Sequence, residues 1–124
     1  MLTLIAALAL AADPVPAASP TPSPSPSPVA LSAAQGGALH CGVAFAIGAK
    51  MQAEKSPVAI GWPPLVPQGR EFFVRVVAQL MDETGASREE LTRMAMANVP
   101  SLQDPAALDQ AVNGCLPMLK ASKL

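Results

Sequence analysis

A serine/threonine–proline repeat over residues 19–28 is the feature that most constrains the fold of this chain. Proline at every second position removes backbone amide donors and fixes the φ angle, while the intervening Ser and Thr side chains bury little apolar surface. Neither a packed helix nor a sheet can form from such a segment. We therefore predict a disordered Ser/Pro-rich linker over residues 13–31 and one folded domain over residues 32–124. The linker serves either as a spacer or as a tail without a role of its own.

The residues ahead of the linker are typical of a secretory signal peptide. The apolar run Leu2–Leu10 has the length of a signal core, about 10 residues, and is too short to span a bilayer by itself. The small residues that follow it allow cleavage before Ala12 or before Asp13. No Lys or Arg precedes the run. We predict a signal peptide over residues 1–12, and hence an exported protein, periplasmic or secreted; the alternative is a buried N-terminal helix.

Charge is scarce and unevenly distributed. Charged residues make up 14% of the chain and the net charge is -1, so the chain has no basic surface for nucleic acid. Aromatic residues are only 3%, which argues against sites that bind bases or sugars by stacking. Apart from Asp13, no charged residue occurs before Lys50. The first part of the folded domain must therefore be buried in its own core, in a partner or in lipid.

Capping patterns and apolar periodicity predict an all-α domain, because the alternation expected of strands is missing. Capping boxes open two of the helices, and an Asp-Pro pair opens the last. We expect helices over about 33–54, 68–84 and 88–98, and a fourth that begins after Asp104-Pro105.

Each of these helices has a predicted end, and Ser56-Pro57 is expected to end the first. Gly85 suits the residue after the second helix, because glycine readily adopts a left-handed conformation. Val99-Pro100 is expected to stop the third helix, and Asn113-Gly114 the fourth. Pro117 then begins a last turn. The predicted fold class is a small all-α, four-helix domain stapled by one disulfide.

The disulfide is predicted between Cys41 and Cys115, the two cysteines of the chain. Two cysteines in a small exported domain most often pair. Unpaired buried thiols are the alternative. Redox catalysis is disfavoured, since the chain has no Cys-x-x-Cys pair.

One face of the first helix is rich in small residues and suggests a contact surface. Together with the tryptophan of the following connection it comprises Gly42, Phe45, Gly48 and Trp62. Close approach of another backbone is the physical advantage of such a face. Residues 29–49 are also free of charge and contain a small-xxx-small pattern, so a membrane helix that dimerises is a rival interpretation. A helix buried in the domain is favoured over it.

No arrangement of residues points to catalysis or to a bound metal or cofactor. His40, the one histidine, lies beside Cys41, but neighbouring residues on a helix point about 100° apart. Met94 and Met96 diverge on a helix in the same way. The acidic pairs Asp82-Glu83 and Glu89-Glu90 stand at helix ends, and the second pair suits the helix dipole. We predict a protein that is not an enzyme and that needs no cofactor.

Several short motifs resemble a group of short exported proteobacterial proteins for which no function can be transferred. They are Cys41, Phe45-Ala46, Gly69-Arg70-Glu71-Phe72-Phe73, Met81-Asp82-Glu83, Leu91 and Cys115-Leu116. In architecture the domain is also similar to the periplasmic acid-stress chaperones of the HdeA type, which are small, helical and carry one disulfide. Those chaperones are rich in charge, whereas this chain is poor in charge.

The leading hypothesis is a non-enzymatic binding or structural module in the periplasm. Its expected partner is another protein or a second copy of itself. The alternatives are an acid-activated chaperone and a membrane-associated protein with a single helix.

Overall fold

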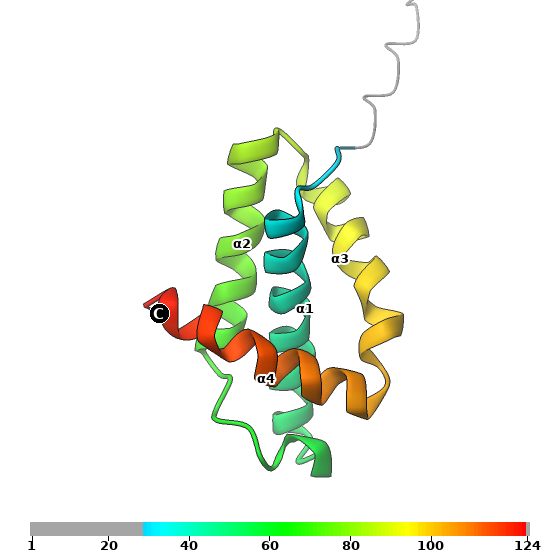
Figure 1. The fold of residues 1–124 in the computed structure, drawn as a ribbon, viewed down its shortest axis with the longest axis vertical. Coiled ribbons are helices and arrows are strands. Elements are labelled where there is room, and N and C mark those ends of the chain that lie inside the picture. The colour runs from blue at the N-terminus through cyan, green and yellow to red at the C-terminus, as the bar shows by residue number, and fades with distance from the viewer. Residues whose placement is uncertain (1–28, 124) are drawn as a thin grey trace, which may run out of the picture.

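The computed structural model describes residues 29–123, and in this range the fold is all-α (Figure 1). The predicted signal peptide and most of the predicted linker lie outside the described residues. Four α-helices and one short 3-10 helix make up the described part, which contains no strand. They are α1 (Ala33–Ala53), η1 (Pro57–Ala59), α2 (Gln68–Thr84), α3 (Arg88–Leu102) and α4 (Pro105–Ala121).

Helix α1 forms the centre of the domain and packs against every other element (Figure 1). It lies between α2 and α3, and α4 crosses it. Its buried residues occupy most of its circumference, and Ala44, Phe45 and Ala49 are completely buried. The charge-free sequence ahead of Lys50 is thus explained by burial in the domain's own core.

The predicted capping box at the start of α1 is confirmed. The Ser32 hydroxyl accepts a hydrogen bond from the Gln35 backbone N–H (3.1 Å), and the Ser32 N–H donates to the Gln35 side-chain oxygen (3.0 Å). The two bonds satisfy amide groups that have no partner within the helix. Val29 and Leu31 ahead of the cap pack against the core. The packed chain therefore begins slightly before the predicted boundary at residue 32.

Helix α2 has the predicted bounds and packs closely on α1. Phe72, Val76 and Leu80 point into the core at successive i+4 positions, as a helix of 3.6 residues per turn requires. Phe72 meets Phe45 of α1 edge to face, with ring centroids 5.3 Å apart. Gly85 follows in the left-handed conformation (φ 73°), and its N–H donates to the Met81 carbonyl.

The predicted end of the third helix is wrong. We expected Val99-Pro100 to stop it, but α3 continues to Leu102 and includes Pro100 in its last turn. Leu102 is 1% exposed and belongs to the core. Its burial favours the additional turn, although a proline inside a helix removes one hydrogen bond.

The predicted end of the fourth helix is wrong as well. Asn113-Gly114 was expected to close it, with a separate turn after Pro117, but α4 runs without interruption to Ala121. The buried side of the helix is a continuous stripe at spacings of three and four residues, formed by Leu108, Val112, Cys115 and Leu119. Packing of this stripe favours one helix over two.

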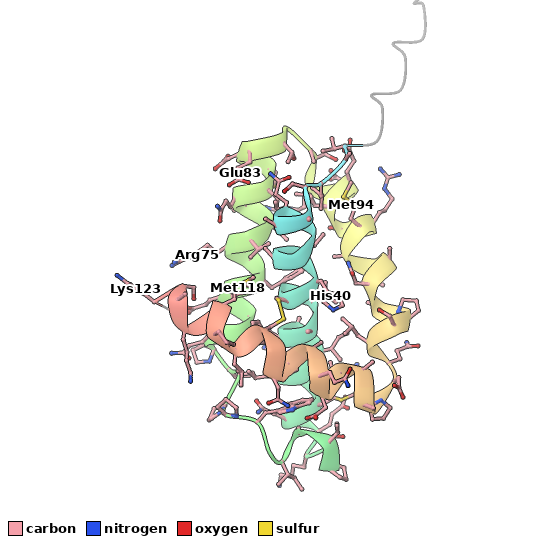
Figure 2. The ribbon with its side chains drawn as sticks, viewed as in Figure 1. His40, Arg75, Glu83, Met94, Met118 and Lys123 are labelled. Carbon is pink, nitrogen blue, oxygen red and sulfur yellow. A yellow bond between two sulfur atoms is a disulfide. The ribbon has the colours of Figure 1, made fainter. Side chains whose placement is uncertain are left out.

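The predicted disulfide between Cys41 and Cys115 is confirmed. It joins the middle of α1 to the second half of α4, with Cα atoms 5.5 Å apart and a sequence separation of 74 residues (Figure 2). Both cysteines are largely buried. The bond therefore lies inside the core, between the central helix and the helix that crosses it.

The connection between α1 and α2 is held by side-chain hydrogen bonds. The Gln52 side chain accepts from the Leu65 N–H and donates to the Pro63 carbonyl, each at 2.8 Å. Trp62 is 6% exposed, and its Nε1–H donates to Asp109 of α4 (2.8 Å). Trp62 thus covers the core and joins the connection to α4, as the sequence suggested.

Glycines of α1 should respond oppositely to alanine substitution. A Cβ added at Gly48 would lie 2.7 Å from Leu65 Cδ1, and Leu65 is itself completely buried. We expect Gly48→Ala to lower the free energy of unfolding by about 1–2 kcal/mol, because crowding outweighs the gain in helix propensity. Gly36 has nothing within 4 Å. Gly36→Ala is expected to raise stability by up to about 1 kcal/mol. Urea unfolding followed by the fluorescence of Trp62 would measure both, and equal effects would contradict the packing at Gly48.

Loss of the disulfide should destabilise the domain strongly. In the loop-entropy model, a cross-link that closes a loop of this length contributes about 4 kcal/mol. Cys41→Ala with Cys115→Ala, or reduction of the native chain, is expected to move the urea midpoint to a much lower concentration. The double variant is insensitive to reductant and serves as the control. A midpoint that reduction leaves unchanged would show that packing alone holds α4 on α1.

Candidate functional site

The predicted contact surface is part of the core. Phe45 is completely buried, Trp62 is 6% exposed, and Gly42 and Gly48 are buried as well. The Cβ position of Gly42 faces Phe73 of α2, whereas that of Gly48 faces Leu65 and Trp62. These small residues do permit close approach, but their neighbours belong to the same chain. The four residues are therefore not an exposed surface, and this prediction is corrected.

His40 joins α1 to α3 (Figure 2). Its Nδ1 lies 3.1 Å from Oδ1 of Asn98, and Asn98 in turn donates from Nδ2 to the Met94 carbonyl. Both side chains of the pair are partly buried. A histidine that hydrogen-bonds to a helix-bound asparagine fixes the position of one helix against another. Met94 packs against the core, whereas Met96 is 61% exposed, so the two sulfur atoms do not share a site.

The acidic pairs lie at the junction of α2 and α3. Glu83 accepts hydrogen bonds from the side-chain amides of Gln35 (3.0 Å) and Gln79 (2.8 Å). These bonds, that from Gln35 most of all, lower the pKa of the Glu83 carboxyl below its ordinary value. Glu89 and Glu90 occupy the first turn of α3, as the sequence predicted, and the Ser87 hydroxyl accepts from the Glu90 N–H. Glu89 and Glu90 thus lie at the positive end of a helix dipole, whereas Asp82 and Glu83 lie at the negative end of α2.

The ionisable groups of the described part lie at or near the surface. Within residues 29–123, no charged or polar side chain is buried. In the same range, no three His, Cys, Asp or Glu side chains are grouped so that they could hold a metal ion. No helix there is both long enough and apolar enough to cross a membrane.

Two apolar regions lie on the surface, and the sequence indicated only the second of them, through Trp62. A shallow hollow between α2 and α3 is lined by seven side chains, most of them apolar: Phe73, Val74, Val77, Ala78, Met81, Arg88 and Thr92. The second region is the connection between α1 and α2, where Ile60 is 83% exposed and Val66 is 49% exposed. The signal for the second region is a run without charge over residues 56–69. Such a run is equally typical of buried chain, so the sequence indicated this connection through Trp62 but did not identify Ile60 and Val66 as its exposed residues.

Comparison with known proteins gives no relative from which a function could be transferred. No protein-family model, characterised protein or solved structure matches this chain. The function must therefore be inferred from the residues and their geometry.

The pKa of Glu83 provides a test of the contact between the start of α1 and the end of α2. Gln35→Ala should raise the pKa of Glu83 toward its ordinary value, and by more than Gln79→Ala does, because the bond from Gln35 has the larger effect. An NMR titration of the Glu83 carboxyl carbon measures this.

The sign of the linked stability change follows from the lowered pKa. The contribution of Glu83 is complete above the pKa of the unfolded chain and is lost as the pH falls through the lower pKa of the folded chain. Ser32→Ala is the control, since it removes the helix cap and keeps the bond from Gln35 to Glu83. A titration identical in Gln35→Ala and the native chain would contradict the contact.

Proposed function

We propose that this protein is an exported, non-enzymatic binding or structural module whose helical core is held by the Cys41–Cys115 disulfide. The disulfide is the observation that carries the proposal. Disulfides form and persist in oxidising compartments and are rare where thiols are kept reduced. The apolar run Leu2–Leu10 and the small residues after it support the same location, the periplasm or the exterior.

Binding is favoured over catalysis by the character of the surface. The hollow between α2 and α3 is lined by Phe73, Val77 and Met81, with Arg88 and Thr92 from α3. Side chains of this kind bury apolar area against a partner and supply no acid–base pair for proton transfer. The partner is another protein, a second copy of this chain or another apolar surface.

An acid-activated chaperone has less support from the geometry. Unfolding by protonation depends on carboxylates that are paired or hydrogen-bonded in the native state. In residues 29–123 the one ion pair is the exposed Lys50–Glu54 pair on α1 (3.9 Å), and the carboxyl with a lowered pKa, that of Glu83, is also exposed. Exposed pairs of this kind contribute little to stability. We therefore do not propose acid activation.

Export and disulfide formation can be tested in one experiment. The full chain is expressed in a bacterial host, and the periplasm is separated from the cytosol. We expect periplasmic protein, shortened by the signal peptide, whose thiols react with a maleimide only after reduction. Cys41→Ser is the matched control, because it leaves Cys115 free to react. Full-length protein in the cytosol with two reactive thiols would refute the proposal.

A further inference from the structure

The connection between α1 and α2 forms an apolar projection at one end of the molecule. It lies at the opposite end of α1 from residues 29–32, where the described chain enters (Figure 1). Residues 56–69 contain no charged side chain. Ile60 is the most exposed large hydrophobic residue of the described part, at 83%. A Cβ at the adjacent Gly61 would have nothing within 4 Å, so the tip is open to its surroundings.

The projection has a fixed shape. Gln52 hydrogen-bonds to Leu65 and to Pro63, and Trp62 hydrogen-bonds to Asp109, so the connection is joined to both α1 and α4. A 3-10 turn, η1, precedes the tip. Ile60 is therefore held in solvent by the folded structure rather than by chance motion of a free loop. Holding an aliphatic side chain in water forgoes the free energy of its burial, which a partner would recover.

Unpaired cations border the projection. Lys55 lies two residues after the end of α1, and Lys120 of α4 lines the same hollow as Pro63 and Pro64. Neither lysine has an ion-pair partner among residues 29–123. Two of the nearby carboxylates are engaged: Glu54 pairs with Lys50, and Asp109 accepts hydrogen bonds from Trp62 and Asn113. The charge of a third, Glu71 in the first turn of α2, is balanced by that of the adjacent Arg70.

Negative charge is concentrated at the other end of the molecule. The corner between α2 and α3 carries four carboxylates, those of Asp82, Glu83, Glu89 and Glu90. Figure 2 shows Glu83 at that end, away from Lys123 at the end of α4. The apolar projection is thus turned toward an anionic partner, whereas the α2–α3 corner would be repelled by one.

We infer that residues 57–67, which we call the apolar loop, dock on the surface of an anionic phospholipid bilayer. Ile60 enters the boundary between headgroups and acyl chains, and Lys55 and Lys120 contact lipid phosphates. An aliphatic tip with flanking cations is the arrangement that interfacial membrane contact requires. The inference rests on the proposed binding function and adds to it a second surface, the apolar loop, whose partner is a lipid surface rather than a protein.

Vesicle sedimentation tests the role of the tip. The oxidised full chain is mixed with vesicles of phosphatidylcholine and phosphatidylglycerol, and with vesicles of phosphatidylcholine alone. We expect stronger binding to the anionic vesicles, and a loss of about tenfold in Ile60→Asp. Met96→Asp is the matched control, because Met96 is also an exposed hydrophobic residue (61%) and belongs to α3 rather than to the apolar loop. Equal effects of the two substitutions would overturn the inference, as would no binding at all.

Two further arms test the cations and the orientation. Lys55→Gln and Lys120→Gln should each weaken binding to anionic vesicles about fivefold and leave binding to neutral vesicles unchanged. Brominated acyl chains should quench Trp62, the single tryptophan, which lies two residues from the tip. The mostly apolar residues 2–10 are present in the full chain used for every variant, and anchoring through them alone would leave Trp62 unquenched and Ile60→Asp bound as tightly as the native chain. Either result would overturn the inference.

These outcomes are independent of the export experiment. Vesicle binding is measured with purified oxidised protein, whatever compartment it came from. Failure of lipid binding leaves the export and the disulfide of the proposed function intact. Failure of export would remove the proposed function and leave the measured affinity for lipid standing.

Discussion

The burial of α1 by the three other helices is the interaction on which the rest of the structure depends. A helix with so little charge and so many small residues gains little from its own sequence, since each glycine costs about 1 kcal/mol relative to alanine. Its stability comes from the apolar area covered by α2, α3 and α4. The glycines that weaken α1 in isolation allow its neighbours to approach closely. Phe73 packs against Gly42, and Leu65 and Trp62 pack against Gly48. The same glycines therefore lower the stability of the isolated helix and permit close packing of the core.

Much of this arrangement is visible in the sequence, because caps and cross-links are local or chemical signals. Ser32 with Gln35 correctly marked the start of α1, and Asp104 before a proline correctly marked the start of α4. The cysteine pairing was predictable because only two cysteines exist. The helix ends at Pro100 and at Asn113-Gly114 were mispredicted. At both places the burial of apolar residues further along the helix outweighs the low helix propensity of proline or glycine. That burial depends on residues distant in the sequence, which a local pattern does not reveal.

The candidate sites were harder to predict for a related reason. A face of small residues indicates close packing, but one sequence does not say whether the packed neighbour belongs to the same chain. Gly42 and Phe45 proved to face inward. Ile60 proved to face outward from a segment whose composition is that of a core. In both cases the deciding fact is the path of the chain in space, which for the connection around Ile60 is held by hydrogen bonds of Gln52 and Trp62.

The position of the disulfide makes most of the domain a covalent ring. Cys41 and Cys115 enclose more than half of α1, all of α2 and α3 with the connections on either side of them, and more than half of α4. A protease that cuts the chain once at the Gly85 turn or in the apolar loop would therefore release no fragment, because the two pieces remain joined through sulfur. The exposed connections can thus be nicked without dispersing the helices. In a compartment where proteases are present, such a domain would persist as one molecule for as long as its disulfide remains oxidised.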